Sequence, residues 1–180
     1  MTTHKAVHVP RAGGEFAIAD VETTSPQRDH VRIAVAACGV CGTDREFVAG
    51  HFPGMTWPLT PGHEIAGTIA ELGDGVDDYE VGDRVAVGWF GGCCHQCVPC
   101  HQGDFIHCEN GQVPSYQYPG GYAESVTVPV SALARIPEEL SFAEISAELG
   151  VDIGELRNRL HAARRQLARA AQHLIERDTP

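Results

Sequence analysis

The sequence predicts a mainly β domain over residues 1–140, built as a compact antiparallel barrel or sandwich, followed by a small helical segment over residues 141–180. Short alternating runs of apolar and polar residues recur between clusters of Gly, Pro and Asp, and no helix is positioned to cross between parallel strands. The charge pattern also changes near residue 140. The first part holds seven Lys and Arg against eighteen Asp and Glu, whereas the second holds six of each and is neutral.

Six runs in the first part have the alternation of strands with one face in a core. In chain order they are KAVHV, EFAIADV, HVRIAVAACGV, EIAGTIAEL, DRVAVGW and YAESVTVPV. A hydrophobic content of 43% is sufficient for such a core, and no segment approaches the roughly 20 apolar residues of a membrane span. The glycine run from Gly73 lacks the third glycine of a dinucleotide-binding loop and opens no helix.

We expect a cytoplasmic protein, because the amino terminus contains no apolar run of signal-peptide length. Thiols stay reduced in that compartment. The seven cysteines, five of which lie within sixteen residues, are therefore interpreted as metal ligands more readily than as disulfides.

The most specific pattern is C-x2-C-x2-C-x7-C, formed by Cys94, Cys97, Cys100 and Cys108. At this spacing four thiolates can surround one zinc ion tetrahedrally without long loops. Reactive or disulfide-bonded cysteines are the alternative, which the even spacing and the reducing setting disfavour. Cys93 is left over, because using it would spoil the regular first interval. A closed site of this kind is expected to hold a lobe together and to perform no chemistry.

A second constellation joins Cys41 of CGVCGTD to His63 of PGHEIAG, with Asp44 and Glu64 beside them. A thiolate and an imidazole with one more ligand leave a position for water or substrate, as in a catalytic zinc site. The alternative is that these side chains are merely packed, which is what we expect for Cys38.

These motifs, in this order, resemble the GroES-like catalytic domain of zinc-dependent medium-chain alcohol dehydrogenases over residues 3–140. The resemblance rests on CGTD from Cys41, on GHE with the following Gly67 and Gly73, on the four-cysteine lobe and on GGYAESVTVP. It implies a GroES-like β-barrel with a zinc lobe and a small alcohol or aldehyde as substrate.

By this resemblance, Cys41 and His63 bind a catalytic zinc, and Glu64 coordinates it when other ligands are absent. Thr43 passes the substrate's hydroxyl proton outward, and Asp44 holds the ring of His63. In the family a further zinc-binding cysteine and a Rossmann domain follow, and an ungapped alignment places Gly150 at that cysteine position. We therefore expect NAD(P) only if another chain or domain supplies it, and no dehydrogenase activity from this chain alone.

The last forty residues predict two helices joined by a tight turn. Ser141 and Glu144 form a capping box, Gly150 ends the first helix, and Asp152 with Glu155 opens the second. The apolar residues of the second helix repeat at intervals of three and four: Leu156, Leu160, Ala163, Leu167, Ala170 and Leu174. This pattern predicts a helix-turn-helix.

Residues 141–176 resemble region 4 of extracytoplasmic-function-type sigma factors, which implies DNA or RNA polymerase as a partner. The expected base, phosphate or polymerase contacts are Arg157, Asn158, Arg159, Arg164 and Arg165. The alternative is a helical hairpin whose arginines form a solvated face and whose leucine stripe makes a homodimer. Two functions thus remain open: an alcohol-dehydrogenase-like zinc domain that is inactive alone, and a DNA-binding transcription regulator.

Overall fold

The structure is a computed structural model that describes residues 2–137. The expected helix-turn-helix lies outside the described residues, together with its proposed DNA contacts Arg157, Asn158, Arg159, Arg164 and Arg165. The described residues up to 136 belong to one compact unit. None of the described helices has the length and apolar character that a membrane crossing requires.

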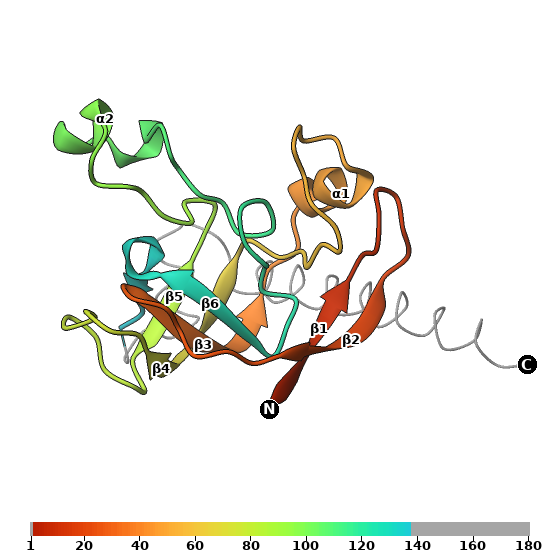
Figure 1. Ribbon diagram of the computed structural model, residues 1–180, viewed down its shortest axis with the longest axis horizontal. Helices are drawn as coiled ribbons and strands as arrows, with labels where there is room; N and C mark the ends of the chain where they lie inside the picture. The colour runs from red at the N-terminus through yellow and green to blue at the C-terminus, as the bar shows by residue number, and fades with distance from the viewer. Residues whose placement is uncertain (1, 138–180) are drawn as a thin grey trace, which may run out of the picture. The chain divides into compact units, whose positions relative to one another are not determined.

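Two antiparallel sheets make up this unit (Figure 1). The first pairs β1 (Thr3–His8) with β2 (Ala17–Glu22). The second has the strand order β6-β3-β4-β5-β7. Its members are β3 (His30–Cys38), β4 (Ile65–Leu72), β5 (Arg84–Val87), β6 (Ser125–Pro129) and β7 (Ala134–Arg135). All six expected runs form strands, and the architecture is mainly β as predicted.

The core follows from the alternation. Buried residues alternate along part of four strands, and their apolar side chains meet in one cluster that also contains Ala132: Val31, Ile33, Ile65, Ile69, Val85, Val87, Val126 and Val128. On β4, Gly67 replaces the apolar residue that the alternation would require. A Cβ on Gly67 would lie 2.2 Å from the carbonyl oxygen of Ala34, so β3 and β4 approach each other there more closely than a side chain would allow.

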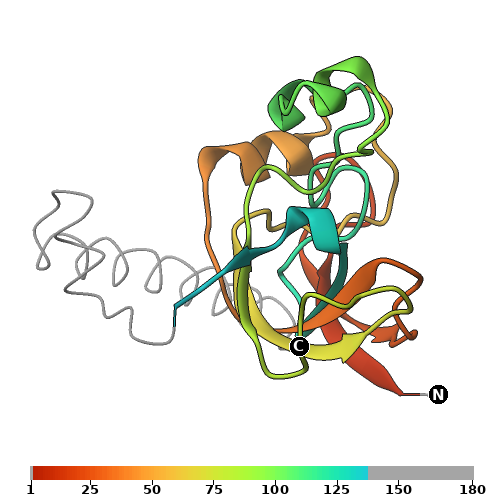
Figure 2. The same ribbon diagram turned by 90° about the vertical axis from the view of Figure 1, so that its left-hand side faces the viewer.

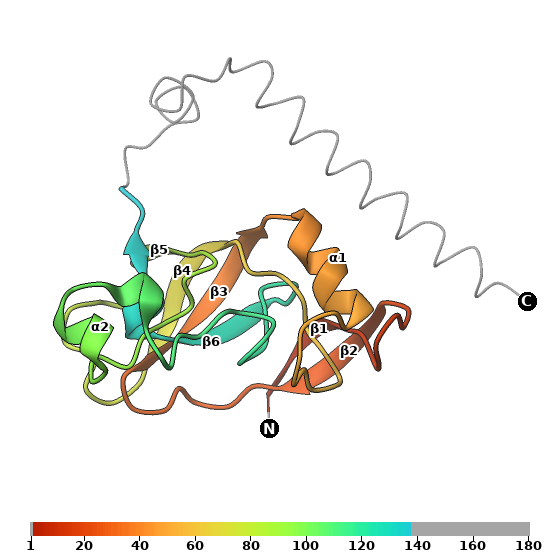
Figure 3. The same cartoon turned by 90° about the horizontal axis from the view of Figure 1, so that it is seen from above.

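The helices are short and lie outside the sheets. They are α1 (Gly42–Ala49) and α2 (Val98–His101), with two 3-10 turns, η1 (Phe105–His107) and η2 (Val130–Ala132). Figures 1 and 2 show α1 and α2 on the same side of the strands, and the view from above in Figure 3 places them at opposite ends. These two ends carry the two groups of metal-ligating residues.

Helix α1 was not expected from the sequence. It begins at Cys41, whose sulfur accepts a hydrogen bond from the Thr43 N–H at 3.3 Å, while Asp44 Oδ2 accepts one from the Cys41 N–H at 3.0 Å. This reciprocal capping satisfies N–H groups that a helix start leaves without partners. The helix ends at Gly50, which has a left-handed backbone with φ of 79°.

The segment that contains α2 and η1 leaves the barrel and returns to it at a neighbouring point. At its base the N–H of Gly91 donates to the carbonyl of Gln112 at 2.8 Å, and the N–H of Gln112 donates to the carbonyl of Gly92 at 3.0 Å. We call residues 92–111 the lobe. All five cysteines of the sequence cluster lie within it.

Candidate metal centres

The four cysteines predicted as a set do converge in the lobe. One sulfur atom from each of Cys94, Cys97, Cys100 and Cys108 lies within 4.8 Å of the others. The sulfur of Cys108 is 3.5 Å from that of Cys94 and 3.9 Å from that of Cys97. Tetrahedral zinc with Zn–S bonds of about 2.3 Å requires sulfur atoms about 3.8 Å apart. The donor set and its spacing therefore fit a structural zinc ion, and we call these residues the thiol quartet.

Neighbouring groups give the quartet's thiols unequal acidity. The N–H of Gln96, the side chain of Asn110 and the N–H of Cys97 donate to the sulfur of Cys94 and lower its pKa to about 6. Burial raises the pKa of Cys100 to about 12. Cys94 is thus already a thiolate at neutral pH, whereas Cys100 must lose a proton when a metal binds.

The second group lies at the start of α1. Ligand atoms of Cys41, Asp44 and His63 are within 4.8 Å of one another, and the sulfur of Cys41 is 3.2 Å from His63 Nε2. Zinc bonds to sulfur at about 2.3 Å and to imidazole nitrogen at about 2.0 Å would separate the two donors by about 3.5 Å. Cys41 caps α1 and His63 lies two residues before β4, so the start of a helix and the approach to a strand each supply one ligand. This donor pair fits a zinc ion that keeps open positions.

Asp44 holds Cys41 and His63 in place through hydrogen bonds. Its side chain is buried, and Oδ1 accepts hydrogen bonds from the Gly62 N–H and from His63 Nδ1, both at 3.1 Å. Oδ2 accepts from the Cys41 N–H and from the Tyr122 hydroxyl, both at 3.0 Å. Because a carboxylate only accepts, the proton of the ring lies on Nδ1 and the lone pair of Nε2 faces Cys41. With four donors already bound, Asp44 is better suited to orient His63 than to bind metal itself.

Tyr122 was not identified by sequence reasoning, which treated it only as part of a strand. Its hydroxyl lies 3.0 Å from Asp44 Oδ2 and 3.2 Å from the carbonyl of Gly39. Burial, followed by the charge of Asp44, raises its pKa above the usual range, so the hydroxyl remains a donor. A tyrosine that is partly buried needs a partner for its hydroxyl, and that requirement was the only signal available.

Two aromatic rings flank His63, and sequence reasoning did not single out either of them. Phe47 and Trp89 meet the imidazole edge-on, with centroid distances of 5.9 and 5.6 Å, and stack on each other at 6.0 Å. Phe47 is fully buried, whereas Trp89 is half exposed. Trp89 thus forms an apolar wall beside the second group that an approaching molecule can touch.

Thr43 and Glu64 occupy different positions relative to the metal ligands. Thr43 lies in the first turn of α1, next to the sulfur that its N–H contacts. Glu64 is exposed, and its carboxylate lies so close to Gly39 that a Cβ there would be 2.1 Å from Oε2. Within residues 2–137, Glu64 is not one of the donors that converge with Cys41 and His63.

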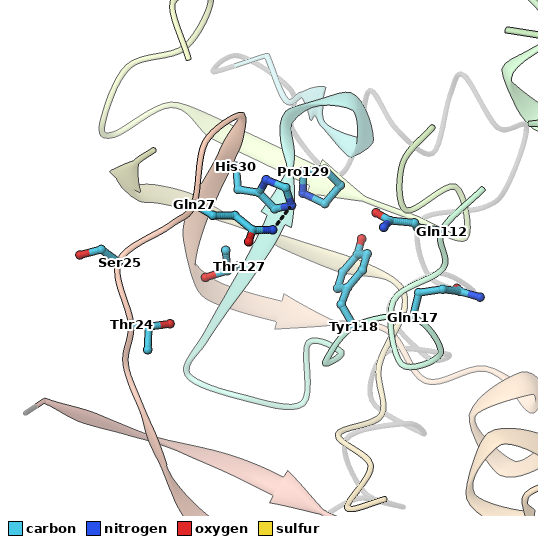
Figure 4. A pocket seen from close by; sticks show the side chains of 9 residues that line it. All are labelled: Thr24, Ser25, Gln27, His30, Gln112, Gln117, Tyr118, Thr127 and Pro129. Carbon is cyan, nitrogen blue, oxygen red and sulfur yellow. Dashed lines mark hydrogen bonds between the residues drawn. The ribbon is translucent and has the colours of Figure 1, made fainter. Parts of the chain in front are cut away.

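A pocket of about 320 Å³ lies apart from both groups, between the segment before β3, strand β6 and the loop after the lobe (Figure 4). Uncharged polar side chains such as Gln27, Gln112 and Thr127 line it. None of its lining residues belongs to the thiol quartet or to the second group.

Comparison with known proteins places these features in context. The family profile described as the alcohol dehydrogenase GroES-like domain matches residues 27–138. The alcohol dehydrogenase patD of Aspergillus clavatus is 36% identical over 148 residues, which cover 82% of this chain and 38% of that protein.

Two solved structures are also similar. A putative zinc-binding dehydrogenase from Sinorhizobium meliloti 1021, bound to NADP, has a TM-score of 0.69 and 34% identity, covering 78% of this chain and 40% of its own. A cobalt- and zinc-bound thermostable alcohol dehydrogenase from Pyrobaculum aerophilum has a TM-score of 0.71 and 29% identity, covering 79% and 44%. The chain spans about 40% of the length of these proteins.

Proposed function

The chain belongs to the alcohol dehydrogenase GroES-like domain family, and from that premise we propose that it is the zinc-binding, substrate-facing domain of a zinc-dependent alcohol dehydrogenase. In this proposal Cys41 and His63 hold a reactive zinc ion, and the thiol quartet holds a structural one. The observation that carries the proposal is the 3.2 Å approach of the Cys41 sulfur to His63 Nε2, with Asp44 fixing the ring.

A zinc ion in the second group supplies Lewis acidity toward an alcohol or aldehyde oxygen. The chain's own residues would prepare the site for it. Asp44 keeps Nε2 of His63 unprotonated and directed at the metal position. Trp89 limits the access of water on one side. Thr43 is assigned to pass the substrate's hydroxyl proton outward, since it lies in the first turn of α1 beside Cys41.

Two protein ligands are fewer than the three that catalytic zinc sites usually have. We assign Glu64 as the additional ligand, because it adjoins His63 in the chain. Its carboxylate would have to turn away from Gly39 to reach the metal. Mutation of Glu64 should therefore weaken zinc binding at the second group without affecting the quartet.

Oxidation of an alcohol also needs a nicotinamide, which supplies the chemistry of hydride transfer while the protein orients it. The similar proteins are more than twice as long as this chain, and the alignment covers less than half of each. We propose that turnover requires a nucleotide-binding domain from the same polypeptide or from another one. The 180 residues by themselves are expected to bind zinc and to oxidise no alcohol.

The described cysteines support a reducing compartment, which we take to be the cytoplasm. All seven are free in the structure, and the four quartet sulfurs are spaced for a metal instead of being paired at bonding distance.

Metal analysis of single variants tests the proposal. The purified chain should contain two zinc ions, Cys41→Ser should lose one, and Cys108→Ser should lose the other, as measured by inductively coupled plasma mass spectrometry. Cys38→Ser and Cys93→Ser are the matched controls, because these cysteines lie outside both groups, and both should retain two zinc ions. Unchanged zinc in Cys41→Ser would refute the reactive site, and unchanged zinc in Cys108→Ser would refute the structural one.

A further inference from the structure

The fifth cysteine of the lobe has a partner of its own. The sulfur of Cys93 lies 3.4 Å from Nε2 and 3.8 Å from Nδ1 of His95. Cys93 is partly exposed and His95 is exposed, so solvent reaches both. A thiol and an imidazole at this distance are two of the donor types that zinc prefers, and their separation is close to the roughly 3.5 Å that a shared ion requires.

The backbone of His95 links this pair to the thiol quartet. Its φ is +55°, in the left-handed region that few residues other than glycine adopt. In this conformation its N–H donates to the sulfur of Cys100, inside the quartet, while its ring faces Cys93. One residue therefore contacts a quartet thiol with its main chain and the spare thiol with its side chain.

Both members of the pair are held in place. The N–H of Cys93 donates to the hydroxyl of Ser131 at 3.2 Å, which attaches the start of the lobe to η2. The ring of His95 meets Phe105 edge-on with a centroid distance of 5.7 Å. Cys93 is also the direct chain neighbour of Cys94, so a spare sulfur lies next to a member of the quartet in the chain.

We propose that Cys93 and His95 form a loading site, through which zinc enters and leaves the thiol quartet by exchange of sulfur ligands. The inference rests on the proposed function only in taking the quartet to be a zinc site. With two protein ligands and open positions, the loading site binds zinc weakly and exchanges it readily, unlike the closed quartet.

The exchange is balanced without any oxidant or reductant. On loading, Cys93 releases its thiol proton to solvent as its sulfur bonds to zinc, and His95 contributes a nitrogen lone pair. The four quartet sulfurs then bond to zinc as Cys93, His95 and water leave it. Each quartet sulfur that is still a thiol, Cys100 included, releases its proton to solvent, and Cys93 regains one. Departure of zinc follows the same steps in reverse.

Exchange of bound zinc for an isotopically labelled zinc ion tests this proposal on the metal-loaded chain. Every protein in the series carries Cys41→Ser, which removes a ligand of the second group and so empties it. Serine is chosen because it can also cap α1. Cys93→Ser and His95→Asn are compared with the parent, asparagine being chosen because it tolerates a left-handed backbone. His101→Asn, at an exposed histidine of the same lobe, is the matched control.

We expect the parent and all three variants to retain one zinc ion. Isotope exchange should be severalfold slower in Cys93→Ser and in His95→Asn, and unchanged in His101→Asn. Equal exchange rates in all four proteins would overturn the loading site while leaving the quartet intact. A parent protein without bound zinc would overturn the quartet itself, and thus the proposed function.

Discussion

The hydroxyl of Tyr122 donates a hydrogen bond to Asp44 Oδ2 over 3.0 Å, although 78 positions separate the two residues in the chain. This contact joins the segment before β6 to the first turn of α1. Asp44 in turn accepts hydrogen bonds from Cys41 and His63, so the tyrosine is connected to both donors of the second group through this one carboxylate. Outer contacts of this kind set the orientation and basicity of metal ligands.

Loss of the tyrosine hydroxyl should weaken metal binding at the second group. Tyr122→Phe leaves one buried carboxylate oxygen with a single donor, and we expect the affinity for cobalt at this site to fall by about 10-fold or more. The measurement is an absorption titration with cobalt. Tyr118→Phe is the control, because the hydroxyl of Tyr118 donates to the carbonyl of Gly91, away from Asp44. An unchanged affinity in Tyr122→Phe would contradict the assigned role.

Zinc binding by the quartet should weaken as the pH falls. Each bound zinc displaces the proton of Cys100, whose pKa is raised to about 12, so this proton is released throughout the range from pH 9 to pH 6. Below about pH 6 the dependence should steepen, because Cys94, with its pKa lowered to about 6, also becomes protonated in the free protein. Competition with a chelator of known affinity measures both effects. An affinity that does not vary with pH would exclude thiolate ligation.

The ion pair of Arg32 and Glu71 should stabilise the barrel only above acidic pH. The two side chains approach to 2.5 Å between β3 and β4, and the hydrogen bond from Arg32 lowers the pKa of Glu71. A carboxylate with a depressed folded-state pKa contributes stability above its unfolded pKa of about 4.3 and loses that contribution as the pH falls through the folded value. Urea unfolding of the parent and Glu71→Gln should therefore differ at pH 7 and converge in acid.

A double-mutant cycle controls this prediction. If the pair acts as a unit, Arg32→Gln should remove most of the effect of Glu71→Gln at pH 7. Simple addition of the two effects would show that the pair contributes nothing of its own.

A methyl group at Gly67 should destabilise the five-stranded sheet. Its Cβ would lie 2.2 Å from the carbonyl oxygen of Ala34 and 2.7 Å from a methyl carbon of Ile33, so β3 and β4 would have to separate. We expect Gly67→Ala to lower the free energy of unfolding by about 2–4 kcal/mol, measured by urea denaturation. Gly88→Ala is the control, since nothing lies within 4 Å of its added Cβ. A loss as large in Gly88→Ala would assign the effect to glycine replacement in general.

The strands and the quartet were predictable because their signals are local. Alternation over five to eleven residues marks a strand with one buried face, and the quartet sulfurs converge within the span from Cys94 to Cys108. Helix α1 was missed because its eight residues carry no sustained apolar stripe and follow a cysteine, which is an unusual capping residue.

The contacts that were missed are long-range or depend on side-chain direction. No pattern in the sequence near Tyr122 or Trp89 predicts which residues their side chains contact. The sequence pattern placed Glu64 beside His63 but did not show the direction of either side chain. In the structure His63 is buried against Asp44 and Glu64 is exposed, so the assignment of Glu64 as a metal ligand stays a prediction. The sigma-like interpretation of residues 141–176 stays a prediction, because the family match ends at residue 138 and the structure describes the chain only to residue 137.

The paired hydrogen bonds between Gly91, Gly92 and Gln112 bring the two ends of the metal-holding excursion together. Because the chain leaves and returns at adjacent points, the whole excursion could be cut out and replaced by a tight hairpin without rethreading a single strand. We expect the second group, whose members lie outside this excursion, to keep its framework when the excursion is removed.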